Sequence, residues 1–245
     1  ALPDRGHLAA IYDCRQGGGV WQREGKTQQE TLQDFWQFMA DRRVCPDRVR
    51  PEPRLAYKDG QVVADFAEYD KAAAYYFDVL KLPHSYTPGV FYGFGWGHPP
   101  YAKFGEQPYE GRYPFEGVDR GKLRPEYKRA YQAVLKAYWD HVKAKGWADR
   151  IVLYMSDEPY DSKPEIRAQM QALCDMVHEV DPAIRIYVSN WHEQPEWEGG
   201  YLNVWGAGHY GCFSVEKMRK LQATGDTIWF TTDGRLAEGS ISNIF

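Results

Sequence analysis

The sequence has little that would support several common kinds of site. Its four cysteines are widely spaced and contain no C-x-x-C pair: Cys14, Cys45, Cys174 and Cys212. This spacing argues against a zinc site and a disulfide-rich scaffold, and it leaves zero, one or two disulfides open. No H-E-x-x-H or comparable histidine spacing occurs. We therefore expect no metal and no other cofactor.

Long apolar runs and an excess of one charge are also missing. No apolar stretch among the 245 residues approaches the length of a membrane span. The formal net charge is −4, which provides no basic surface for nucleic acid or anionic membrane. The glycines at 17–19 lack the spacing of a phosphate-binding loop, so we interpret them as a flexible connection.

Aromatic residues, in contrast, are abundant. They make up 16% of the chain, with 9 Trp and 18 Tyr. Aromatic side chains can simply fill a core. Many of these, however, follow predicted strands together with Gly, Asn and His, a grouping more typical of a pocket lining.

Short apolar strands alternate with amphipathic helices along most of the chain. We expect strands at 8–12, 84–93, 151–155, 184–190, 202–205 and 226–232, and helices at 31–40, 66–80, 125–145, 164–180 and 215–224. The alternation predicts an α/β fold, and the steady spacing favours a (β/α)8 TIM-type barrel. A doubly wound open sheet is the alternative, although it usually has a glycine-rich first turn.

We expect a single barrel domain over residues 1–245 with some irregular parts. Leu55 to Asp65 predicts a hairpin that turns at Asp59-Gly60. The long aromatic loop at 93–117 is interpreted as a lid that faces the substrate. About seven strands are counted and the tail at 235–245 has no assigned element. Either one strand escapes the pattern or the barrel is incomplete at its C-terminus.

The most informative stretch is the strand at 151–155, which leads into two adjacent carboxylates, Asp157 and Glu158. The strand carries no charge, as expected when both of its faces are buried. A helix is predicted from Pro164 with Ser162 as its cap. The two acids therefore lie in a strand-to-helix turn, on the face of a parallel sheet where catalytic residues collect.

Adjacent carboxylates favour an unusual form of glycoside cleavage. In a regular strand they would point to opposite faces, so they share a site only where the chain curls. Most glycosidases take their two acids from different strands. A neighbouring pair suits attack by the substrate's own 2-acetamido group. We assign stabilisation of the resulting oxazolinium to Asp157 and proton transfer at the leaving oxygen to Glu158. The alternative is an ordinary polar turn.

A family resemblance rests on the same residues. Tyr154-Met-Ser-Asp157-Glu158-Pro159, preceded by Trp147-Ala-Asp-Arg-Ile-Val, resembles the catalytic region of glycoside hydrolase family 123. Stretches that begin at Phe66, Ile186 and Ile228 are also similar to that family, and the similarity extends from about Leu2 to Gly234. The β-sandwich domain that usually precedes the family's barrel is not recognised.

The resemblance implies a retaining, substrate-assisted β-N-acetylgalactosaminidase. It implies that Asp157 orients the amide and that Glu158 is the acid/base. It also implies a glycan or glycoconjugate substrate with a terminal β-N-acetylhexosamine, and a secreted or periplasmic location. The sequence itself contains no signal peptide.

Polar and aromatic residues at other strand ends and in the long loop are candidate sugar contacts. The tryptophans would stack on the apolar face of the sugar, and the others would bind hydroxyl groups or the acetamido group. Each could instead belong to the core or the surface. The candidates are Trp96, His98, Asn190, His192, Trp205, His209, Tyr210 and Trp229.

Three other interpretations stay open. The same barrel could act on β-N-acetylglucosamine, because galacto and gluco sugars differ at one hydroxyl group. It could also bind carbohydrate without hydrolysing it. The last residues, Gly234 to Phe245, resemble the Glu-Gly motif of fold-type IV pyridoxal-phosphate transaminases, but no matching lysine or phosphate site precedes them.

Overall fold

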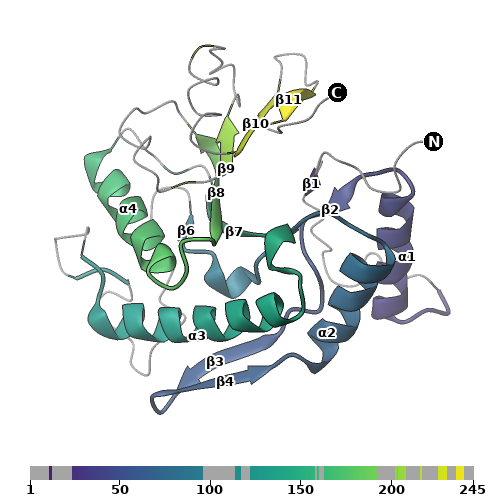
Figure 1. Ribbon diagram of the computed structural model, residues 1–245, viewed down its shortest axis with the longest axis horizontal. Coiled ribbons are helices and arrows are strands. Elements are labelled where there is room, and N and C mark those ends of the chain that lie inside the picture. The colour runs from purple at the N-terminus through teal and green to yellow at the C-terminus, as the bar shows by residue number, and fades with distance from the viewer. Residues whose placement is uncertain are drawn as a thin grey trace.

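The computed structural model describes residues 11–12, 24–95, 114–116, 122–157, 159, 163–191, 202, 204–207, 216, 226–230 and 236–239. Helices and strands alternate in this part of the chain, which confirms the predicted α/β class (Figure 1). Within the same residues, no helix has both the length and the apolarity needed to cross a membrane.

One sheet organises the described part of the molecule. Its strands, in spatial order, are β11 (Leu236–Gly239), β10 (Asp226–Phe230), β9 (Val204–Ala207), β8 (Arg185–Trp191), β7 (Ile151–Asp157) and β5 (Ser85–Tyr86), with β6 (Phe94–Gly95) also beside β7. The pairs from β5 to β10 are parallel, whereas β11 runs antiparallel to β10. The spatial order follows the chain order without a reversal.

Two short strands form a separate small sheet near β5. Strands β1 (Ile11–Tyr12) and β2 (Cys45–Pro46) pair in parallel. The backbone N–H of Tyr86 in β5 donates to the carbonyl of Asp47 at 2.7 Å, directly after β2. The segment after β2 is thereby held beside β5.

The helices begin and end at recognisable signals. Thr27 and Glu30 form a capping box at the start of α1 (Gln28–Ala40). Helix α2 (Ala67–Ala73) continues as a π-helix (Ala74–Val79). Prolines at the first turn begin α3 (Pro125–Ala144) and α4 (Pro164–His178). Gly146, with φ of 73°, follows the end of α3, as expected of a left-handed stop.

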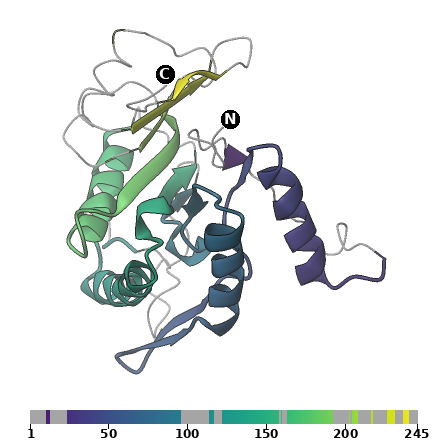
Figure 2. The same cartoon turned by 45° about the vertical axis from the view of Figure 1, so that its right-hand side comes forward.

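Helices α3 and α4 cover one face of the sheet (Figures 1 and 2). A cluster of aromatic side chains lies on the other face. On the helical side, fully buried aliphatic side chains such as Leu153, Met155 and Ile186 belong to the main core. The opposite face carries Val152 and Val204 with the tyrosines of β5, β7 and β8. Successive side chains of a strand point to opposite faces of the sheet, and this alternation separates the aliphatic residues of the main core from the tyrosines.

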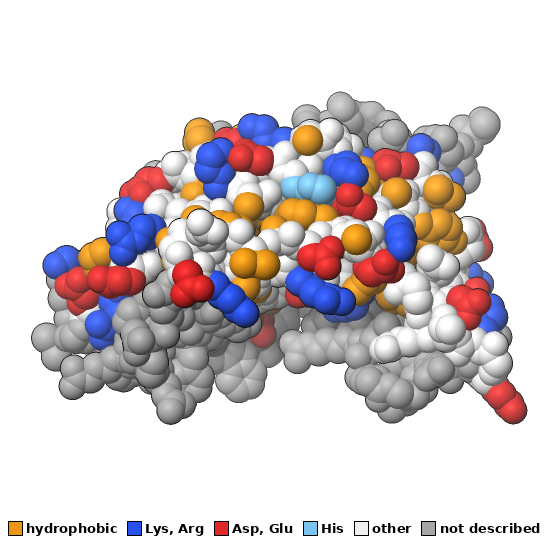
Figure 3. All heavy atoms as spheres, turned by 90° about the horizontal axis from the view of Figure 1, so that it is seen from below, with side chains coloured by type: hydrophobic (Ala, Val, Ile, Leu, Met, Phe, Trp, Pro, Cys, Tyr) orange, Lys and Arg blue, Asp and Glu red, His pale blue; other side chains and the backbone are white. Residues whose placement is uncertain are grey.

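The predicted hairpin is confirmed as β3 (Arg54–Lys58) and β4 (Gln61–Asp65). Asp59 and Gly60 both have positive φ, at 49° and 76°, as in the type I′ turns that commonly join the two strands of a hairpin. The hairpin lies along α3. On this side of the molecule, acidic and basic side chains are interspersed with apolar ones (Figure 3).

Several expectations need correction. The closed barrel is not observed, because the described sheet has two ends and its last strand is antiparallel. The doubly wound alternative fits no better, since such sheets reverse their strand order. Strand β11 lies in the tail at 235–245, which had no assigned element, and β2 lies where no strand was expected.

The cap predicted for α4 is also wrong. Lys163 occupies the N-cap position without a side-chain hydrogen bond, and Pro164 starts the helix instead. Strands 8–12 and 226–232 are confirmed over the residues that the structure describes. The glycines at 17–19, most of the loop at 93–117 and most of the helix at 215–224 lie outside the described residues.

Candidate active site

Asp157 is the last residue of β7 and lies half-buried at the carboxyl end of the parallel sheet. Its Oδ1 accepts a hydrogen bond from the hydroxyl of Tyr154 at 3.0 Å. Its backbone N–H donates to the hydroxyl of Tyr92 at 3.1 Å. Two tyrosines therefore hold this residue, one through its carboxylate and one through its backbone.

A β-bulge places Tyr154 and Asp157 on the same face. Tyr154 pairs with Tyr187 of β8, but the next pair joins Ser156 to Val188, so β7 has one extra residue between these pairs. Residues three apart in a regular strand point to opposite faces. The extra residue shifts the alternation by one, and the carboxylate of Asp157 comes within hydrogen-bond distance of Tyr154.

The tyrosine cluster consists of Tyr86, Tyr154 and Tyr187, one from each of three neighbouring strands. Its ring centroids are 4.8 Å apart between Tyr86 and Tyr154, 5.1 Å between Tyr154 and Tyr187, and 5.6 Å between Tyr86 and Tyr187. Tyr92 meets Tyr154 edge-on at 5.5 Å. These distances are typical of favourable aromatic contacts, and each ring restricts the movement of the others.

Burial keeps the hydroxyl groups of Tyr86 and Tyr187 protonated. It raises the pKa of Tyr187 to about 12, against a hydrogen bond with Tyr86 that lowers it, and the charge of Asp157 adds to the rise. Burial also raises the pKa of Tyr86 well above its ordinary value. At neutral pH these two side chains are neutral hydrogen-bonding groups, so they bring no negative charge to the surroundings of Asp157.

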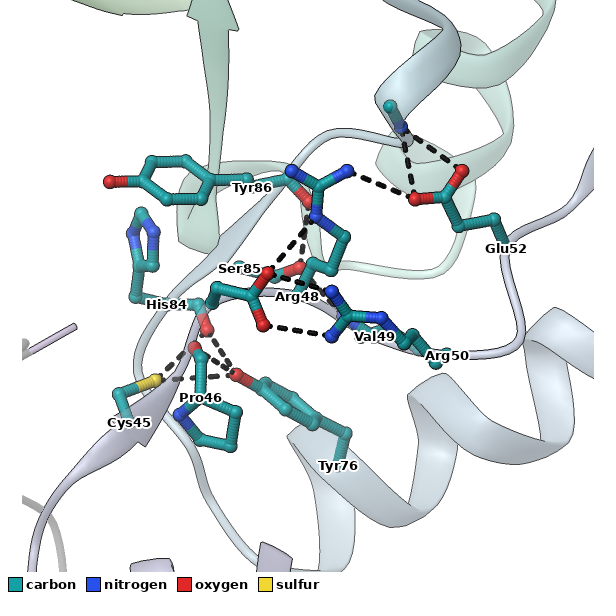
Figure 4. A network of polar contacts seen from close by, with 12 residues as sticks. Cys45, Pro46, Arg48, Val49, Arg50, Glu52, Tyr76, His84, Ser85 and Tyr86 are labelled. Atoms are coloured by element: carbon teal, nitrogen blue, oxygen red, sulfur yellow. Dashed lines mark hydrogen bonds and ion pairs between the residues drawn. The ribbon is translucent and has the colours of Figure 1, made fainter. Parts of the chain in front are cut away.

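A polar network fixes the segments beneath β5 (Figure 4). Asp47 is 2% exposed, and its two carboxylate oxygens accept from Arg50, each at 2.8 Å. Arg48 donates to Glu52 at 3.0 Å, and Glu52 accepts from the backbone N–H of Gly89. Paired charges of this kind are strongly directional and fix the chain after β2, and the bond from Gly89 to Glu52 joins it to the chain after β5.

The hydroxyl of Tyr76 reinforces the same junction. It lies 2.9 Å from the carbonyl of Pro46 and 2.7 Å from that of His84 (Figure 4). His84 is buried and meets Tyr86 edge-on at 4.9 Å. Burial lowers its pKa to about 3, so the imidazole is neutral and packs as a core side chain. The junction thereby holds Tyr86 in place through its contact with His84.

The other predicted site residues are described only in part. Glu158, Trp96, His98, His192, His209 and Tyr210 lie outside the described residues. Asn190, Trp205 and Trp229 belong to β8, β9 and β10, and only their backbones are described. Because these strands are parallel, the ends of β8 to β10 meet at the sheet edge that Asp157 occupies. Trp229 pairs with Ala207, which pairs with Trp191.

The tyrosine cluster was not predicted from the sequence. Tyr154 and Tyr187 each follow a buried aliphatic residue in a strand, and a tyrosine next to the aliphatic residues of a strand is the signal that could have identified them. Tyr86 gives no comparable signal because β5 has only two residues. Among the described residues, no group of three His, Cys, Asp or Glu could hold a metal ion.

Comparison with protein families identifies the kind of protein. The family described as glycoside hydrolase 123, catalytic domain, matches residues 56–232, more than two thirds of the chain. The chain belongs to this family. It is a glycoside hydrolase, and its substrates are glycans. The matched residues include α3, β7 with Asp157, the tyrosine cluster and strands β8 to β10. No curated protein matches the chain.

Proposed function

We propose that this glycoside hydrolase is a retaining exo-enzyme that releases terminal β-linked N-acetylgalactosamine. In this proposal the substrate's acetamido group is the nucleophile and an oxazolinium ion is the intermediate. The observation that carries it is the position of Asp157. Its carboxylate lies at the carboxyl end of a parallel strand, on the face away from the helices, held by Tyr154. Glu158 follows directly in the chain.

The proposed reaction has two steps. The acetamido oxygen attacks the anomeric carbon while the bond to the leaving oxygen breaks and Glu158 protonates that oxygen. Asp157 holds the amide N–H as positive charge develops on the oxazolinium. Glu158 then removes a proton from water, and the water attacks the anomeric carbon and reopens the ring. Two displacements on one carbon give overall retention of configuration.

The surroundings of Asp157 support a sugar substrate. Beside Asp157, the partly exposed rings of Tyr154 and Tyr187 combine apolar faces with hydroxyl groups, the combination that sugar rings require. We retain eight proposed sugar contacts: Trp96, His98, Asn190, His192, Trp205, His209, Tyr210 and Trp229.

The unreversed strand order supports a (β/α)8 architecture, and we include one such domain over residues 1–245 in the proposal. The proposal also includes a secreted or periplasmic location.

Three nitrophenyl glycosides test this function. The protein should release nitrophenol from the β-N-acetylgalactosaminide faster than from the β-N-acetylglucosaminide, and it should not act on the β-galactoside, which lacks the acetamido group. Rapid release from the β-galactoside would contradict substrate assistance. A preference for the glucosaminide would change the assigned specificity. Binding of N-acetylgalactosamine-thiazoline without any hydrolysis would indicate a carbohydrate-binding barrel instead.

A further inference from the structure

We propose that Tyr154 is a positioning residue that orients the carboxylate of Asp157 toward the acetamido group of the substrate. The inference rests on the proposed function and assigns a role to a side chain next to the catalytic pair. It stands on three features of the described residues. These are the hydrogen bond to Asp157, the bulge that makes it possible, and the aromatic packing that fixes the tyrosine.

The hydrogen bond sets the direction of the whole carboxylate. The hydroxyl of Tyr154 donates to Oδ1 of Asp157 at 3.0 Å. The two oxygens of a carboxylate are rigidly linked, so a bond that fixes Oδ1 also fixes the direction of Oδ2. Hydrogen bonds between a neutral donor and a charged acceptor are among the stronger ones in proteins. The carboxylate therefore has a preferred orientation before substrate binds.

The bulge lies in β7 between Tyr154 and Asp157, where it allows this hydrogen bond to form. The pairs Tyr154 with Tyr187 and Ser156 with Val188 leave Met155 as the extra residue. Met155 and Ser156 are both fully buried, and the backbone carbonyl of Met155 accepts from the N–H of Gly93 at 3.0 Å. The core thus holds the irregular backbone, and the next residue, Asp157, returns to the face of Tyr154. Bulges near active sites often re-aim a side chain in this way.

Tyr154 is itself held on several sides. Tyr86 and Tyr187 pack against its ring from the neighbouring strands, and Tyr92 contacts it edge-on. Tyr92 also accepts the backbone N–H of Asp157 at 3.1 Å, so the same aromatic group fixes both the side chain and the backbone of the acid. A ring packed this way cannot follow a carboxylate that rotates away. Precise positioning of a catalytic side chain requires that the residues around it are held rigidly in this way.

This role predicts a specific kinetic pattern. Asp157 acts on the amide as the oxazolinium forms, so a poorly oriented carboxylate should raise the energy of the transition state more than that of the bound substrate. Replacement of Tyr154 should then lower kcat and leave KM nearly unchanged. Affinity for N-acetylgalactosamine-thiazoline, which resembles the intermediate, should fall in parallel with kcat/KM.

The test compares Tyr154→Phe with the wild-type protein and with Tyr69→Phe. Tyr69 is a matched control, because its buried hydroxyl lies 3.0 Å from that of Tyr138, in the α2–α3 layer away from Asp157. We expect Tyr154→Phe to lower kcat/KM for nitrophenyl β-N-acetylgalactosaminide by about 10- to 100-fold, the usual effect of a lost hydrogen bond to a charged group. Its inhibition constant for the thiazoline should rise by a similar factor, and Tyr69→Phe should leave both constants unchanged.

A double-mutant cycle separates positioning from a general structural effect. If Tyr154 acts through Asp157, adding Tyr154→Phe to Asp157→Asn should cause little further loss. Equal losses in both backgrounds would overturn the proposal, as would a Tyr154→Phe protein with wild-type kcat/KM and thiazoline affinity. Failure of the proposed function is seen separately, in the wild-type protein. There it would appear as hydrolysis of the β-galactoside or as insensitivity to the thiazoline.

Discussion

The hydroxyl of Tyr154 and Oδ1 of Asp157 are joined by a hydrogen bond of 3.0 Å, although the two residues are three positions apart on one strand. The extra residue at the bulge makes this possible by returning Asp157 to the face of Tyr154. The same irregularity bears on the adjacent acids. Because side chains no longer alternate regularly between the two faces at this end of the strand, two consecutive carboxylates there can point toward one site.

The two acids should respond differently to the leaving group of the substrate. Glu158→Gln should nearly abolish turnover of substrates with poor leaving groups and should spare activated aryl glycosides, because these depart without protonation. Asp157→Asn should impair both, since in the proposed reaction the oxazolinium forms whatever group departs. The measurement is kcat/KM for each variant on an aryl and an alkyl β-N-acetylgalactosaminide. Equal losses on both substrates for both variants would contradict this division of roles.

Gly93→Ala should disturb the bulge directly. A Cβ at this position would lie 2.5 Å from Sδ of Met155 and 3.5 Å from Leu173, and both side chains are fully buried. Overpacking of a core usually costs about 1–3 kcal/mol of unfolding free energy. We expect a loss of that size by urea denaturation, together with reduced kcat/KM because Met155 must move.

Gly89→Ala provides the matched control for this substitution. Its added Cβ would meet Nη1 of Arg48 at 2.8 Å. This is the end of a long side chain, and its shift would weaken only the partly exposed ion pair with Glu52, which contributes little. The control should therefore lose less stability and keep its activity. A Gly93→Ala protein as stable and as active as the control would show that the bulge tolerates displacement of Met155.

Asp181 should make the stability of the protein depend on pH in the acid range. The pKa of its carboxyl is lowered from 3.8 to about 2, mainly by the backbone N–H of Ala183 and by Lys143, with a smaller effect of Trp139. Because the folded state has the lower pKa, the stabilisation is complete above about pH 5 and disappears as the pH falls toward 2. After allowance for solvent screening, it should amount to about 1 kcal/mol.

Asp181→Asn tests this dependence. The substitution should destabilise the protein at pH 7 and have little effect near pH 2, as measured by urea denaturation at both values. Asp140→Asn is the control, since Asp140 pairs with Lys136 at the surface, where side chains are more than half exposed, and such pairs contribute little. A loss for Asp181→Asn that is the same at both pH values would contradict the role of its ionised form.

Regular periodicity made most of the fold predictable. In the helix predicted at 66–80, the apolar residues at helical spacing face the core. Leu80 is partly buried, and the others are buried: Tyr69, Ala72, Ala73, Tyr76 and Phe77. The uncharged run at 151–155 predicted a strand there, and the strand is confirmed. It extends two residues further than expected, so Asp157 is its last residue and not part of the turn after it. Both signals arise because burial along one element leaves a pattern in neighbouring residues.

The parts that escaped prediction depend on contacts between distant residues. Strand β2 has two residues and β11 has four, too few for a period to be recognised. The bulge has no signal in Leu153-Tyr-Met-Ser-Asp157, because it arises from the pairing of β7 with β8. The tyrosine cluster likewise forms only when β5, β7 and β8 lie side by side.

The most direct test of the central claim varies the nucleophile that the substrate is proposed to supply. Nitrophenyl β-galactosaminides with acetyl, fluoroacetyl, difluoroacetyl and trifluoroacetyl groups on the amine differ in the electron density of the carbonyl oxygen. If that oxygen attacks the anomeric carbon, kcat/KM of the wild-type protein should fall progressively with each added fluorine. Rates that do not change along the series would contradict participation of the acetamido group, and with it the roles assigned to Asp157 and Tyr154.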